Sequence, residues 1–121
     1  MIKCILVVED HVDNRDILRD LLTTEGYELI EAMNGKEALE KAATRRPDLI
    51  LMDIQLPILD GYEATRILKS DPILKSIPIV VITSYAMSGD AEKAYSAGCD
   101  AYISKPIDHQ VLLDIIRNRL R

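Results

Sequence analysis

The chain has 121 residues, of which 48% are hydrophobic and 29% are charged, and these proportions are typical of a globular domain with one core. Its net charge is −5 and its longest basic run is Arg45-Arg46, which argues against nucleic acid or an anionic membrane as the main partner. Phe and Trp are absent, so the core must be aliphatic.

Five short apolar segments predict strands, with stretches of helical periodicity between them. Residues 4–8, 49–52 and 77–83 are continuous apolar runs, which are typical of strands covered on both faces. Residues 27–32 alternate apolar and polar side chains, which favours an edge strand, and residues 100–104 predict a short last strand. Only a plain turn, Met33-Asn34-Gly35, is expected after the second strand.

The stretches that follow the strands predict five helices. The first ends near Gly26, the second before Pro47, and the third extends from about Gly61 to Ser70. The fourth ends at Gly98, and the fifth runs to Arg121. Their apolar stripes are Ile17, Leu18, Leu21 and Leu22; Ala38, Leu39, Ala42 and Ala43; Ile67 and Leu68; Ala91, Ala94 and Tyr95; and Val111, Leu112, Ile115, Ile116 and Leu120.

Strands that alternate with helices predict an α/β fold, in which a parallel sheet carries helices on both faces. We find no linker or repeat and expect residues 1–121 to form one domain, with no room for an output domain. Cys4 and Cys99 lack the spacing of a zinc or redox motif, and the N-terminal apolar run is too short for a signal peptide. These features predict reduced thiols and a cytoplasmic protein.

The expected strands end on residues that can carry chemistry. In doubly wound sheets, ligands bind at the carboxyl ends of the strands. Glu9 and Asp10 follow the first strand, Asp53 ends the third, Thr83 ends the fourth and Lys105 follows the fifth. Each residue alone has an ordinary explanation as a helix cap, turn residue or surface charge. Acids, a hydroxyl and a cation at four strand ends together favour one functional site.

Three neighbouring carboxylates repel one another unless a cation binds them. Glu9, Asp10 and Asp53 offer the oxygen ligands that Mg²⁺ prefers, whereas His11 is the only nearby candidate for a softer metal. Such a site suits phosphoryl transfer, with Asp53 as a carboxylate nucleophile and with Thr83 and Lys105 contacting the phosphoryl oxygens. No obvious general base is present to hydrolyse the product quickly. The set therefore predicts a phosphate acceptor.

Four motifs carry a family resemblance: VVED at Glu9-Asp10, DLILMDIQLPILDG around Asp53, VVITSYAM with Thr83, and GCDAYISKPI with Lys105. Together they resemble the receiver domain of two-component response regulators over essentially the whole chain. Among receivers, the chain looks closest to stand-alone regulators and to those of hybrid kinases. The resemblance implies a flavodoxin-like, doubly wound five-stranded parallel sheet in the order 2-1-3-4-5, with five helices.

The resemblance also implies roles for individual residues. Asp53 would be the phosphoacceptor for a histidine kinase or a histidine phosphotransfer protein, and Lys105 would contact the phosphoryl group. The ligands of Mg²⁺ would be Glu9, Asp10, Asp53 and the backbone carbonyl of Gln55. Thr83 and Tyr102 would form the switch pair, Pro106 would belong to the same switch, and the Lys105–Pro106 peptide bond would be cis. The chain would catalyse only its own phosphorylation and dephosphorylation.

By the same resemblance, the output is a contact with a downstream protein. The face formed by the fourth helix, fifth strand and fifth helix would report the phosphorylated state. Its candidate residues are Met87, Tyr95, Tyr102 and Val111. The kinase would dock along the first helix, where we expect Asn14, Arg15 and Leu18 to be at least partly exposed.

Several alternative functions share this fold. A flavodoxin-like cofactor binder would need a glycine- and hydroxyl-rich first loop, where this chain has two acids. An aspartyl phosphatase would want a second acid where Gln55 stands. A pseudo-receiver that binds partners without phosphorylation, or a receiver excised from a hybrid kinase, is the remaining alternative. Gln55 and Tyr85 are bulky and uncharged, and we expect them to slow self-dephosphorylation.

Overall fold

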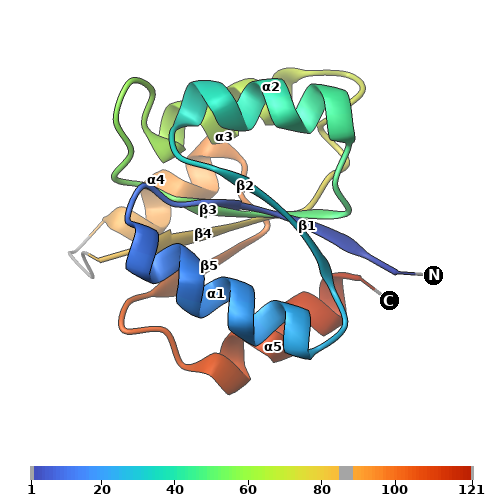
Figure 1. Cartoon of the computed structure of the whole chain (residues 1–121). Coiled ribbons are helices and arrows are strands. Elements are labelled where there is room, and N and C mark those ends of the chain that lie inside the picture. The colour runs from blue at the N-terminus through green and yellow to red at the C-terminus, as the bar shows by residue number, and fades with distance from the viewer. Residues whose placement is uncertain (1, 85–88, 121) are drawn as a thin grey trace.

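The computed structural model describes residues 2–84 and 89–120 and shows a parallel sheet between two layers of helices (Figure 1). The five strands are β1 Cys4–Val8, β2 Glu28–Ala32, β3 Leu49–Asp53, β4 Ile79–Thr83 and β5 Ala101–Ser104. They pair in the order β2-β1-β3-β4-β5, and all four pairings are parallel. The predicted doubly wound fold and strand order are confirmed, with strand ends shifted by one or two residues.

The helices are α1 Val12–Thr24, α2 Gly35–Arg45, α3 Gly61–Ser70, α4 Asp90–Ala97 and α5 His109–Arg119. Helices α1 and α5 cover one face of the sheet, and α2, α3 and α4 cover the other (Figure 1). Asp60 begins α3 by accepting a hydrogen bond from the backbone N–H of Glu63 at 2.9 Å. Among the described helices, none combines the length and apolar character that a membrane crossing requires.

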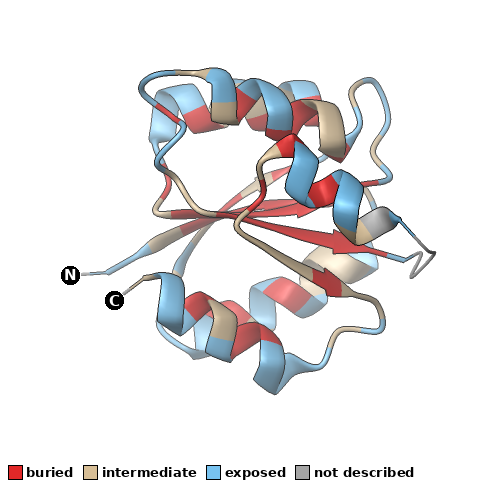
Figure 2. Ribbon diagram, turned by 180° about the vertical axis from the view of Figure 1, so that it is seen from behind, coloured by how far each residue is buried: buried red, intermediate tan, exposed pale blue. Residues whose placement is uncertain are grey.

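Two aliphatic clusters form the core, one on each face of the sheet (Figure 2). Successive strand residues point to opposite faces. In β1, Ile5 and Val7 pack toward α1 and α5, whereas Leu6 and Val8 pack toward the other three helices. The same alternation runs through β3 and β4, whose residues are all buried. The continuous apolar runs therefore mark strands with both faces covered, as predicted.

The apolar stripe of α1 differs in part from the prediction. Leu18 and Leu22, one helical turn apart, are buried under the sheet, but Ile17 is 51% exposed. A helix advances about 100° per residue, so Ile17 lies at the margin of the buried stripe. Leu18 is only 6% exposed, and its expected exposure to a kinase is therefore wrong. Ile67 of α3 is likewise largely exposed.

The segment predicted as a plain turn holds the loop that follows β3. Gly35 is buried, and its N–H donates to the carbonyl of Leu59 at 3.1 Å. A Cβ atom at residue 35 would lie 2.1 Å from that same carbonyl oxygen. Only glycine permits this approach, so residues 33–35 do more than reverse the chain. The close contact joins the start of α2 to the segment between Asp53 and α3.

Candidate functional site

The backbone carries Glu9, Asp53 and Lys105 to the same face of the sheet. Glu9 N–H donates to Ala32 O at 3.0 Å and Lys105 N–H to Thr83 O at 2.7 Å, so the strand pattern continues past β1 and β5. The alternation then places all three side chains on the side of α1 and α5. The ammonium of Lys105 lies 3.4 Å from Glu9 Oε1 and 3.5 Å from Asp53 Oδ2. The structure thus brings these three predicted residues together.

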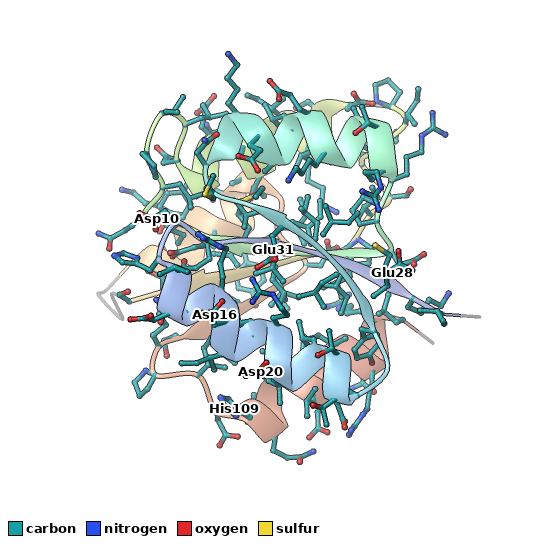
Figure 3. All side chains as sticks on the ribbon, viewed as in Figure 1. Asp10, Asp16, Asp20, Glu28, Glu31 and His109 are labelled. Carbon is teal, nitrogen blue, oxygen red and sulfur yellow. The ribbon has the colours of Figure 1, made fainter. Side chains whose placement is uncertain are left out.

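Three acids of the site each have an oxygen atom without a hydrogen-bond partner in the described chain. Glu9 is 2% and Asp53 5% exposed, and Asp10 is half-buried in the turn between β1 and α1 (Figure 3). Glu9 Oε2, Asp10 Oδ1 and Asp53 Oδ1 are buried, and no residue that the structure describes forms a hydrogen bond to them. Burying an unpaired carboxylate is costly. One free oxygen from each acid is a donor set that fits a hard divalent cation.

The pKa values of the two buried acids move in opposite directions. Burial, followed by the close approach and the negative charge of the Glu9 carboxylate, raises the pKa of Asp53 to about 7. Burial alone would raise the pKa of Glu9 as well. The close approach of Asp53, the hydrogen bond from Asn14 and the positive charge of Lys105 outweigh burial and lower the pKa of Glu9 below its ordinary value. Of the two acids, Asp53 is therefore the one whose protonated form the site favours.

Helix α1 fixes Glu9 through two polar side chains that were expected only at the kinase-docking surface. Asn14 Nδ2 donates to Glu9 Oε1 at 2.6 Å, and Arg15 donates from its guanidinium to the backbone carbonyl of Glu9 at 2.9 Å. Both residues lie in the first turn of α1 and are half-buried. Their spacing of five and six residues from Glu9 was visible in the sequence. The direction of their side chains was not.

His11 offers a second way to complete a metal site. Its Nδ1 lies 3.2 Å from Asp10 Oδ1, and single donor atoms of Glu9, Asp10 and His11 all lie within 4.8 Å of one another. The His11 side chain is 71% exposed, however, so it is accessible to solvent. The buried unpartnered oxygen of Asp53 has no such access to water. Donor-atom spacing thus groups Glu9 and Asp10 with His11, whereas the buried free oxygen of Asp53 favours a set that includes Asp53.

Thr83 and Tyr102 lie on the opposite face of the sheet from the acids. Thr83 is buried at the end of β4, where it follows Ile79 and Val81 on the side of α2, α3 and α4. Tyr102 of β5 packs against that same cluster, and it pairs in register with Val81. The two predicted switch residues are thus near neighbours on adjacent strands. The Lys105–Pro106 bond is cis, as the resemblance implied.

The loop after Asp53 turns sharply. Leu59 N–H donates to Pro57 O at 2.7 Å, and Ile58 between them has φ 71°. This is a γ-turn in the left-handed region, which a β-branched residue rarely adopts. Gln55, in the first half of the loop, is exposed. Tyr85 and Met87, which also carried sequence predictions, lie outside the described residues.

A cavity of about 510 Å³ opens beside the acids. Glu9, Asp53 and Lys105 contribute its charged lining, and Asn14 and His109 add further polar side chains. Apolar side chains from α1, from the strands and from the segment after β5 make up the remainder. A reactant that approaches Asp53 through this cavity therefore meets both charged and apolar groups.

Comparison with known proteins places the chain in a family. The family model described as "Response regulator receiver domain" matches residues 5–117. The polar-differentiation response regulator DivK of Brucella anthropi is 48% identical over 120 residues, which cover 99% of this chain and 98% of DivK. DivK of Brucella ovis is 46% identical over the same length and coverage.

Solved structures agree with this placement. The receiver domain of a signal transduction histidine kinase from Syntrophus aciditrophicus has a TM-score of 0.92 and 34% identity, covering 98% of this chain and 89% of that one. The receiver domain of a sensor histidine kinase from Pseudomonas aeruginosa has a TM-score of 0.92 and 34% identity, and the match covers 99% of this chain and 98% of that one. That structure is described with a magnesium ion coordinated in its active-site cleft.

Proposed function

Since the chain belongs to the response regulator receiver family and acts in two-component signalling, we propose that Asp53 accepts the phosphoryl group in an Mg²⁺-dependent reaction. One observation carries this proposal. Glu9, Asp10 and Asp53 each hold a buried oxygen without a hydrogen-bond partner in the described part of the chain, and Lys105 lies next to Glu9 and Asp53. This arrangement needs added positive charge and offers one reactive carboxylate.

Asp53 acts as the nucleophile in this proposal. One of its carboxylate oxygens forms a bond to phosphorus while the bond between phosphorus and a histidine nitrogen of the donor protein breaks. Lys105, 3.5 Å from Asp53 Oδ2, is placed to pair with a phosphoryl oxygen. Through this pairing, Lys105 offsets negative charge that Asp53 gains with the phosphoryl group. The hydroxyl of Thr83 is the proposed hydrogen-bond donor to a second phosphoryl oxygen.

Glu9, Asp10, Asp53 and the backbone carbonyl of Gln55 are the residues that we propose hold Mg²⁺. The cation, when bound, offsets the negative charge of the acids and of the phosphoryl oxygens. The magnesium ion described in the Pseudomonas aeruginosa receiver domain supports this assignment. The raised pKa of Asp53 adds a requirement, because its proton must leave before the carboxylate can bind a cation or attack phosphorus.

The partners that we propose are a histidine kinase or a histidine phosphotransfer protein as donor and a downstream protein as target. The donor would dock beside α1, where exposed Ile17 replaces the buried Leu18 as the apolar contact. The target would bind the face that carries exposed Tyr95 and Val111, with Tyr102 at its edge. We place this exchange in the cytoplasm, without direct contact with nucleic acid or membrane. The whole chain, 1–121, would act as one receiver domain.

The test is phosphorylation by a small donor. The protein is incubated with acetyl phosphate and Mg²⁺ and followed by intact mass, beside Asp53→Asn and the exposed-site control Asp20→Asn. We expect one phosphoryl adduct on the wild type and on the control, and none on Asp53→Asn. When EDTA is present during the incubation, no adduct should form on any of the three proteins. An equal adduct on Asp53→Asn would remove Asp53 as the acceptor. No adduct on the folded wild type would favour the pseudo-receiver alternative.

A further inference from the structure

We propose that Asn14 is a positioning residue for the metal site. It holds the Glu9 side chain so that Oε2, and not Oε1, faces the cation. This inference rests on the proposed function, because it presumes that the three acids bind Mg²⁺. It adds a residue outside the acids, the hydroxyl and the lysine that the family motifs contain.

The hydrogen bonds of Glu9 divide its two oxygens into different roles. Oε1 accepts from Asn14 Nδ2 at 2.6 Å and lies 3.4 Å from Lys105 Nζ. Oε2 is buried and accepts no hydrogen bond from any residue of the described chain. A carboxylate oxygen that already has two donors is a poor metal ligand, whereas its free twin is available. The asymmetry selects Oε2 as the ligand.

Glu9 needs this restraint because of its length. A glutamate has one more rotatable bond than an aspartate, so a fixed backbone leaves its carboxylate more positions to visit. The Glu9 backbone is fixed on both sides, since its N–H donates to Ala32 O and its carbonyl accepts from Arg15. Lys105 divides its ammonium between Glu9 and Asp53 at 3.4 and 3.5 Å. The short bond from Asn14 is the strongest restraint on the side chain.

The place of Asn14 in the helix explains how it reaches Glu9. Asn14 is the third residue of α1, and side chains in a helix point back toward its N-terminus. A polar residue at this position often bonds the backbone N–H of the N-cap residue. Here the amide donates to the Glu9 carboxylate instead, and the His11 side chain makes no capping bond. The first turn of α1 thus holds the side chain of Glu9 in place.

A double-mutant cycle tests the inference. Asn14→Leu removes the donor at nearly constant volume, and Glu9→Asp shortens the acid so that it no longer reaches residue 14. Mg²⁺ affinity is measured by calorimetry on wild type, both single variants and the double variant. We expect Asn14→Leu to weaken binding about 10-fold in the wild-type background, as loss of a ligand's supporting hydrogen bond commonly does. In the Glu9→Asp background the loss should be less than about 2-fold, because the two residues no longer act together.

The controls separate positioning from a general effect on folding. Asn118→Leu, on the exposed side of α5, should leave Mg²⁺ affinity unchanged. Urea unfolding in EDTA reports the stability of each variant, and Asn14→Ser, which keeps a polar side chain too short to reach Glu9, replaces Asn14→Leu if the latter does not fold. Equal losses in both backgrounds, or no loss in the wild type, would overturn the inference while leaving Asp53 phosphorylation intact. Absence of Mg²⁺ binding to the wild type would instead contradict the proposed function.

Discussion

Replacing Asp53 with asparagine should make the folded protein more stable at pH 8 when divalent cations are absent. Burial and the adjacent Glu9 raise the pKa of Asp53 to about 7 from its ordinary 3.8. At pH 8 the folded wild type must therefore keep a buried charge that the unfolded chain exposes to water. An amide has the same shape without the charge, and its N–H groups can donate to Glu9. The substitution removes an acid that opposes folding.

The pKa shift sets the size and the pH dependence of the effect. A rise from 3.8 to about 7 corresponds to at most about 4 kcal/mol, at about 1.36 kcal/mol per pKa unit. We expect about 1–3 kcal/mol, because dissolved ions and water screen the charge. The folded state binds the Asp53 proton more tightly than the unfolded state. The contribution of this group to stability is therefore complete below about pH 4 and is lost as the pH rises through about 7.

The assay is urea unfolding followed by far-ultraviolet circular dichroism, for wild type, Asp53→Asn and Asp20→Asn. At pH 8 in EDTA, Asp53→Asn should have the highest free energy of unfolding, and at pH 5 less than about half of its advantage should remain. Added Mg²⁺ should narrow the gap, since it stabilises only the variants that bind it. Asp20→Asn, at an exposed site, should follow the wild type within about 0.5 kcal/mol. Equal or lower stability of Asp53→Asn at pH 8 would refute the reasoning.

Three further predictions follow from the site and its loops. If Asp53 is a metal ligand as proposed, Mg²⁺ affinity should fall about 10-fold between pH 8 and pH 6, because protons compete for its carboxylate, whose pKa is about 7. Calorimetry that shows equal affinities would contradict this. Gly35→Ala should cost about 1–3 kcal/mol in urea unfolding, since its Cβ would lie 2.1 Å from the Leu59 carbonyl oxygen. The exposed neighbour variant Lys36→Ala should change little, and equal effects would argue against the close contact. Replacing both Gln55 and Tyr85 by small or acidic residues should shorten the lifetime of the phosphorylated form, because water would reach the phosphoryl group more easily. An unchanged rate of loss of the phosphoryl adduct, followed by intact mass, would contradict this prediction.

The strand ends were predictable because they depend on backbone rules alone. Parallel strands bring their carboxyl ends to one edge, so Glu9, Asp53 and Lys105 could be grouped from their positions after apolar runs. The alternation of side chains along each strand then decides which face each residue joins. No knowledge of side-chain rotamers was required for either step.

Features that depend on contacts between distant segments were not predictable. The role of Gly35 arises from its contact with the carbonyl of Leu59, which lies 24 residues further along the chain. The composition of residues 33–35 is typical of an ordinary turn and does not indicate this contact. Ile17 and Leu18 are both apolar, and only the packed helix shows which of them is buried. The bond from Asn14 to Glu9 depends on two rotamers at once. Sequence patterns locate an element, but a rotamer is settled by its neighbours.

The placement of the site on two faces of one sheet has a consequence for signalling. Glu9, Asp53 and Lys105 extend the face toward α1 and α5, whereas Thr83 and Tyr102 belong to the face toward α4. Under the proposed function, a phosphoryl group on Asp53 would have to act on Thr83 and Tyr102, which belong to the opposite face. Asp53 and Thr83 each end a strand, and these two strands, β3 and β4, are paired. This carboxyl edge would then be the junction through which a chemical event on one side of the sheet alters the other.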